Sequence, residues 1–297
     1  MENLIGKREF LAAGVLGLGL GITGAAFGQP AAAAGSPPPG GRARREIPNR
    51  MAKTSVMFKT PEGFPNAIAV APEGLWIGEQ KEGRNAAPGA DTREAAWLVD
   101  WNGKLLKTVM TESKNTSGMA YGDNCVWMGA NAAPEGIFQT DMSSRTVSHR
   151  QIPLGPADNG GGCHGLLWND GKLWIAALRL RGMLRVDPKT WAPEMFIPVA
   201  LPENRARLHG IAWDNGAIWI VTGNDSKSFA EGKPGLAKYD AATGELLETV
   251  EFVPGAADPH GLAMHNGALI SCDAGLHPGW PTNDSPTSQT IFRIDLI

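Results

Sequence analysis

Short apolar segments recur at nearly regular intervals along this chain, separated by polar stretches rich in Gly, Asn and Asp. The clearest unit opens with His-Gly, runs through a few apolar residues, turns at a polar segment with Gly, and enters a second apolar run. Copies of this unit start at His164, His209 and His260. The residue ten positions further on is Trp174, Trp219 or Ile270. Short apolar runs bounded by turn residues predict β-strands.

Two further copies, without His, start at Asn66 and Ser117, and each again has a Trp ten residues on. The five copies are spaced by 51, 47, 45 and 51 residues. Each copy continues into a third apolar run that ends in Asp, and the first four then have a fourth strand-like run. Four short strands at this period are typical of a propeller blade. The sequence therefore predicts an all-β protein, a β-propeller of five four-stranded blades.

The last copy is incomplete, because the chain ends at Ile297 just after the third strand. An apolar segment at Thr54–Lys59 precedes the first copy. Pairing this segment with the last blade would supply the missing strand and remove an open sheet edge. We therefore expect the propeller domain to span residues 54–297.

The N-terminal residues predict a targeting segment. Residues 1–28 contain Lys7-Arg8, a Gly- and Ala-rich apolar run, and a small-residue cleavage site. The order Lys-Arg-Glu-Phe-Leu resembles a twin-arginine export signal with Lys at the first Arg. An ordinary secretory signal or an uncleaved anchor is the alternative. Residues 29–53 read as a disordered linker, and we expect a periplasmic or secreted protein with no membrane span after signal removal.

Composition narrows the possible partners. Net charge is −3 and the folded part has no basic cluster, which argues against nucleic acid because phosphate neutralisation needs clustered Lys and Arg. Three cysteines without a CxxC motif exclude a disulfide scaffold. No Ser–His–Asp spacing, phosphate loop or nucleotide fingerprint is present. We expect a monomer that acts on a small molecule.

The blade motif, His-Gly with an apolar strand, then Gly-x-Leu-Trp and an Asp-ended strand, resembles the bacterial propellers of the virginiamycin B lyase, SMP-30 gluconolactonase and YncE-like superfamily. The resemblance covers residues 60–297. It implies an all-β propeller and either a metal-assisted elimination or a lactone hydrolysis that uses a divalent cation. Five blades departs from the six or seven usual there, and no catalytic residue carries over from those families.

Strand order in a propeller places the starts of all first strands at one channel mouth. His164, His209 and His260 should therefore face one another across three consecutive blades. Three imidazoles that leave open positions towards Asn66 and Ser117 match a catalytic metal site with three protein ligands and water. The expected metal is Zn, Fe, Mn or Cu rather than Ca or Mg. The alternative is that His-Gly is a blade motif whose His bonds a neighbouring loop.

The ends of the second strands and the long loops after them meet the same mouth. Glu79 and Asp273 are candidates for a fourth ligand or a general base, and His277 is the third candidate catalytic residue. The candidate substrate-binding residues are Asn66, Ser117, Asn131, Arg179 and Trp280. The predicted function is an exported metal-dependent lyase or lactonase-type hydrolase; the alternative is a non-catalytic propeller that binds a ligand or a protein.

Overall fold

A computed structural model describes residues 46–61, 63–81, 92–154, 162–199, 207–223, 233–275 and 287–297. These residues form twenty strands and one short 3-10 helix, η1 (Leu178–Leu180). None of them belongs to a helix long and apolar enough to cross a membrane. The predicted export signal and most of the predicted linker lie outside the described residues.

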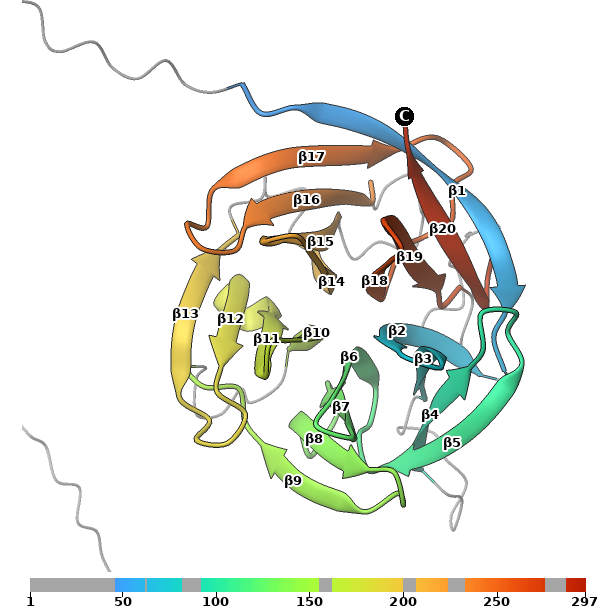
Figure 1. The fold of residues 1–297 in the computed structure, drawn as a ribbon, viewed down its shortest axis with the longest axis vertical. Coiled ribbons are helices and arrows are strands. Elements are labelled where there is room, and N and C mark those ends of the chain that lie inside the picture. The colour runs from blue at the N-terminus through green and yellow to red at the C-terminus, as the bar shows by residue number, and fades with distance from the viewer. Residues whose placement is uncertain are drawn as a thin grey trace, which may run out of the picture. The chain divides into compact units, whose positions relative to one another are not determined.

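The strands form five blades of four strands each, arranged around one axis (Figure 1). Blade 1 consists of β2 (Phe64–Ala71), β3 (Gly74–Gln80), β4 (Glu94–Val99) and β5 (Leu105–Thr111). Blade 2 consists of β6 (Thr116–Gly122), β7 (Cys125–Ala130), β8 (Gly136–Asp141) and β9 (Thr146–Arg150). Blade 3 consists of β10 (Cys163–Asn169), β11 (Lys172–Ala177), β12 (Gly182–Val186) and β13 (Pro193–Pro198).

Blade 4 consists of β14 (Arg207–Asp214), β15 (Ala217–Gly223), β16 (Gly235–Asp240) and β17 (Leu246–Phe252). Blade 5 consists of β18 (Leu262–His265), β19 (Ala268–Asp273), β20 (Thr290–Leu296) and the N-terminal strand β1 (Asn49–Lys59). Within every blade, neighbouring strands are antiparallel, and the first strand lies nearest the axis (Figure 1). The predicted five-blade propeller is confirmed.

The repeated Trp residues are buried at the contacts between neighbouring blades. Trp76, Trp127, Trp174 and Trp219 are each at most 2% exposed. Trp174, for example, packs with Ile211 and Ile218 of the next blade. Since burying one large aromatic side chain contributes a few kcal/mol of transfer free energy, roughly 2–3, this position explains why every blade keeps an apolar residue there.

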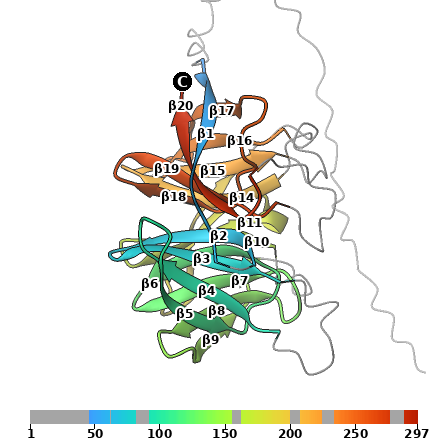
Figure 2. The same cartoon turned by 90° about the vertical axis from the view of Figure 1, so that its right-hand side faces the viewer.

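The ring closes through β1, as predicted. Thr54 pairs with Ile294 and Val56 with Phe292 in an antiparallel ladder with β20. The strand starts earlier than expected, however, at Asn49, and Asn49–Ala52 pairs in parallel with β17 of blade 4. Figure 2 shows β1 running beside both strands. The predicted linker boundary at residue 53 is therefore wrong, because residues 49–53 belong to the sheet.

Candidate functional site

Four of the five repeat positions lie where the first strand of the blade bulges. In blade 1, Pro65 pairs with Glu79 and Ala67 with Gly78, so Asn66 is an extra residue. The same irregularity involves Ser117 in blade 2, His164 in blade 3 and His209 in blade 4. In blade 5 the backbone N–H of His260 donates to the carbonyl of Cys272, just before β18 begins. A bulge re-aims the side chain of the extra residue.

These five residues form a polar ring around the axis, one from each blade. The imidazole centroids of His164 and His209 are 5.1 Å apart, and those of His209 and His260 are 4.9 Å apart, both edge to face. His260 Nδ1 lies 2.5 Å from Asn66 Oδ1. Asn66 Nδ2 in turn donates to Ser117 Oγ at 3.0 Å. We call this set the polar ring.

The axis is closed directly beside the polar ring. The next residue in each blade is small: Ala67, Gly118, Gly165, Gly210 or Gly261. At this level the space between the first strands is too narrow to hold a water molecule. A Cβ on Gly165 would lie 2.4 Å from the carbonyl oxygen of His209, and Gly210 N–H donates to the carbonyl of His260 at 2.9 Å. The Gly of each His-Gly pair is therefore required by the close approach of neighbouring strands.

A buried charge network supports one side of the ring. Asp258 Oδ2 lies 3.1 Å from His260 Nε2, and Asp258 Oδ1 lies 3.3 Å from the Arg207 guanidinium. Burial raises the pKa of Asp258, but the Arg207 and His260 charges outweigh it and hold that pKa below its ordinary value. Asn66 Nδ2 already donates to Ser117 and to the Thr116 carbonyl, so Asn66 presents only its oxygen to His260. Both partners of the His260 ring, the Asn66 amide oxygen and the Asp258 carboxylate, are hydrogen-bond acceptors.

His209 lies in surroundings that disfavour its charged form. Burial, then the charge of Arg207 and the two neighbouring histidines, lowers its pKa well below the ordinary value, so its ring is neutral. Among the described residues, neither His209 Nδ1 nor Arg207 Nε has a hydrogen-bond partner, although both atoms are buried. Buried polar atoms are normally satisfied by protein, water or ligand. Each of these two atoms therefore has the capacity to bond a ligand atom or an ordered water.

The structure brings the three predicted metal ligands together at the polar ring. Both ring nitrogens of His260 lie within hydrogen-bond distance of other side chains, Nδ1 of Asn66 and Nε2 of Asp258. Among the described residues, no group of three or more His, Cys, Asp or Glu side chains is placed to hold a metal ion. A metal bound by all three histidines would require His260 to release one of its hydrogen bonds.

The two predicted carboxylates hold loops near the ring. Glu79 is 5% exposed; its Oε2 accepts from the Ala95 N–H at 3.0 Å and lies 3.0 Å from the Lys81 ammonium. Asp273 Oδ2 accepts from the Asp258 N–H at 3.2 Å and from Thr287 Oγ1 at 2.9 Å. Asp273 thus supports the same network through the backbone of Asp258.

The remaining predicted residues are distributed around the same end of the axis. Asn131 holds the segment that leads into His164, since its Oδ1 accepts from Gly162 N–H at 2.9 Å and its Nδ2 donates to the Cys163 carbonyl at 3.2 Å. Arg179, in η1, forms an ion pair with Glu135 at 2.8 Å. His277 and Trp280 lie outside the described residues.

Three charged residues that the repeat comparison missed surround the ring. Arg207 and Asp258 each lie two positions before the repeat histidine of their blade. This shared spacing is the sequence feature by which the pair could have been found. Glu94 accepts from the backbone N–H groups of Lys81, Asn115 and Thr116 and so ties blade 1 to blade 2. Burial nevertheless raises the pKa of Glu94 to about 7.

Comparison with known proteins concerns the fold. The sequence matches no protein-family model, and no curated protein is detectably similar to it. Glutaminyl cyclase from Myxococcus xanthus is similar in structure, with a TM-score of 0.53 and 14% identity over 84% of this chain and 98% of that one.

Two further solved structures are less similar. A protein of unknown function from Bacteroides caccae has a TM-score of 0.44 and 11% identity over 72% of each chain. The WD40 repeats of RRP9 have a TM-score of 0.45 and 11% identity, covering 78% of this chain and 80% of theirs. The blades and the likeness to glutaminyl cyclase together establish that this chain has an all-β propeller fold.

Proposed function

We propose that the protein is a propeller that binds a small polar organic molecule at the polar ring. The observation that carries this proposal is the pair of buried atoms, His209 Nδ1 and Arg207 Nε, which have no partner among the described residues. Arg207 Nε–H is a donor, and the neutral His209 ring can offer either a donor or an acceptor at Nδ1. The matching ligand group is a hydroxyl, carbonyl or carboxylate oxygen.

The closed axis supports the same proposal. A ligand that enters from the ring end meets strand backbone immediately beyond the ring and stops there. Pre-formed concave sites with a few convergent polar groups are typical of small-molecule binding. Asn131, Arg179 and Trp280 are the further candidate contacts of such a ligand.

The second candidate is the exported, monomeric metal-dependent enzyme, a lyase or lactonase-type hydrolase of the superfamily that the blade motif resembles. It is favoured by one observation: imidazoles from three consecutive blades lie side by side. A transition metal held there would supply Lewis-acid chemistry. Glu79, Asp273 and His277 are the candidate ligand or proton-transfer residues in that case.

Two measurements on protein purified without an affinity tag separate the candidates. The first is metal content by mass spectrometry, and the second is thermal stabilisation by lactones, hydroxy acids and polyols. A metal-free protein that one of these compounds stabilises, with the effect lost in His209→Phe, supports a binding propeller. Stoichiometric metal that is lost in His164→Ala and in His209→Ala supports the enzyme.

His265→Ala is the matched control, because His265 is the last residue of β18, at the end away from the polar ring, and stacks on Trp101. It should leave both readouts unchanged. Absence of metal together with absence of stabilisation by every compound refutes both candidates.

A further inference from the structure

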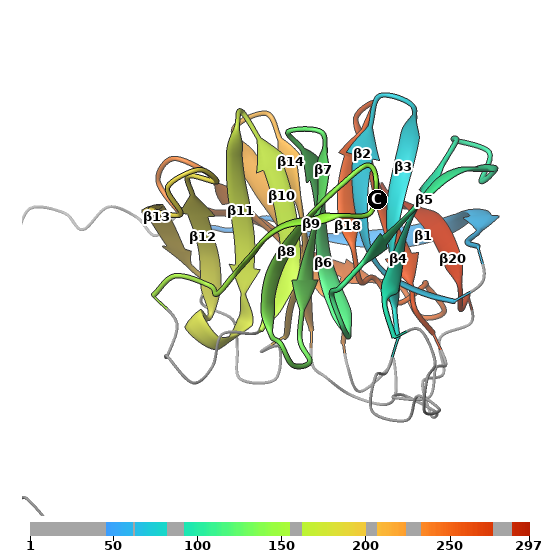
Figure 3. The ribbon, with the colours of Figure 1, turned by 90° about the horizontal axis from the view of Figure 1, so that it is seen from below.

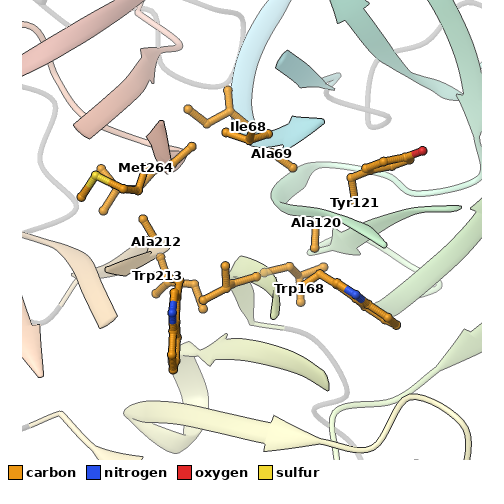
Figure 4. Close-up of a pocket in the computed structure, with 14 residues that line it drawn as sticks. Ile68, Ala69, Ala120, Tyr121, Trp168, Ala212, Trp213 and Met264 are labelled. Carbon is orange, nitrogen blue, oxygen red and sulfur yellow. The ribbon is translucent and has the colours of Figure 1, made fainter. Parts of the chain in front are cut away.

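A second recess occupies the other end of the axis. It is a cavity of about 240 Å³, lined by the residues two to four positions after the polar ring (Figure 4). Its innermost apolar residues are Ile68, Leu166, Ile211 and Leu262. We call this cavity the axial funnel. It lies on the face that carries the turns between the first and second strands of the blades (Figure 3).

The axial funnel and the polar ring are separated by the closed level of the axis. The backbones of neighbouring first strands touch there, as the position of Gly165 against His209 shows. A molecule in the funnel therefore cannot reach the histidines, and the funnel is a separate site.

The funnel is held open by small residues and rigid aromatic walls. Ala120 and Ala212 contribute only methyl groups to its middle, whereas the rings of Tyr121, Trp168 and Trp213 splay away from the axis (Figure 4). Trp168 stacks on Trp127 with centroids 5.7 Å apart, which fixes that wall. A recess with rigid walls stays open for a small molecule, and a cavity of about 150 Å³ is already large enough for benzene.

The entrance of the funnel is acidic. Glu73, Asp123 and Asp170 are exposed in the turns that follow the lining residues of blades 1 to 3. No basic side chain of the described residues pairs with any of the three. The pKa of Tyr121 is raised, mainly by burial and in addition by the negative charge of Glu73. The Glu73 carboxylate therefore acts electrostatically on a side chain of the funnel wall.

Two basic side chains near these turns are already paired with carboxylates. Lys172 pairs with Asp187 and Glu194, and Lys238 pairs with Asp214. The turn carboxylates of Glu73, Asp123 and Asp170, unpaired among the described residues, therefore give the entrance of the recess a negative potential, and such a potential concentrates cations.

We propose that the axial funnel binds a small organic cation, a primary ammonium with a short apolar tail. The tail packs on the Ile and Leu floor, and the ammonium stays at the entrance among the turn carboxylates. This site is independent of the function proposed for the polar ring.

Nuclear magnetic resonance titration with hexylammonium, 1-hexanol and hexanoate tests both parts of the proposal. These probes share the tail and differ in charge. Hexylammonium should bind up to about fivefold tighter than 1-hexanol, as expected for exposed ion pairs, with hexanoate weakest. Added salt should reduce this preference, because exposed charges are screened.

The variant E73Q/D123N/D170N should bind all three probes equally well while keeping the affinity for 1-hexanol. Glu112→Gln is the matched control. Glu112 is an acidic residue directly after β5, at the end of that strand away from the funnel, so this variant should retain the cation preference. The indole N–H signals of Trp168 and Trp213 should shift on binding, and His209→Phe should leave the titration unchanged. Equal binding of the three probes by the wild type, no binding, or shifts confined to other residues would overturn the proposal.

Discussion

Replacing Gly165 by Ala should destabilise the whole propeller, because a methyl group there has no room. The added Cβ would lie 2.4 Å from the carbonyl oxygen of His209 and 3.1 Å from Gly210 Cα. Both atoms are backbone, so neither can rotate away, and blades 3 and 4 must separate by several tenths of an ångström. Overpacking a tight core costs about 1–3 kcal/mol, and the rigid neighbours place Gly165→Ala near the upper end, about 3 kcal/mol.

Gly78→Ala is the matched control. It also adds one methyl to a glycine in a blade strand, but its new Cβ would meet only side-chain atoms, Ala67 Cβ at 3.3 Å and Met119 Cε at 3.4 Å. Its cost should stay within about 1 kcal/mol, since a flexible Met side chain can give way. Urea unfolding measures both free energies from midpoint and slope. Equal costs for the two variants, or a Gly165→Ala protein as stable as the wild type, would refute the reasoning from strand approach.

Three further predictions follow from burial and charge. Trp174→Ala should cost about 3–5 kcal/mol by calorimetry or urea unfolding, because it empties the contact between blades 3 and 4; a cost below about 1 kcal/mol would contradict that packing. Asp258→Ala should cost about 3–5 kcal/mol, since it leaves the buried Arg207 charge without its carboxylate, and stability equal to the wild type would disprove the network. Because the pKa of Glu94 is raised to about 7 in the folded state, the folded protein keeps a proton between about pH 4.5 and 7 that the unfolded chain releases. The free energy of unfolding therefore falls as the pH rises through that window. Unfolding of Glu94→Gln at several pH values should lack this fall, and parallel curves for the two proteins would count against the raised pKa.

The fold was largely predictable from sequence because each blade repeats one pattern of buried positions. The Trp at position ten of four copies had to be buried in the same way in every blade, and the incomplete fifth copy required a strand from elsewhere. The early start of β1 was not predictable, since residues 49–53 are exposed apart from Ala52 and carry no apolar pattern.

The site was predictable only in part. Repeat comparison placed His164, His209 and His260 at equivalent positions, and the structure has them side by side. The bulges depend on which residues pair across two strands, and sequence spacing does not contain that information. The partners of His260 likewise depend on ring closure, which brings Asn66 within 2.5 Å although it is 194 positions away in the chain.

The strand that closes the ring also sets the order of folding. Ser55 donates to Asp295, 240 positions away in the chain, so the last blade cannot form until the C-terminal strand has been synthesised. Contacts of such long range slow folding, because the loop between the partners must be ordered first. Until then β1 and β19 each lack the neighbour β20 and present an unpaired edge, which other chains can join. A nascent chain therefore passes through an aggregation-prone open ring, and chaperone binding during that interval would protect its yield.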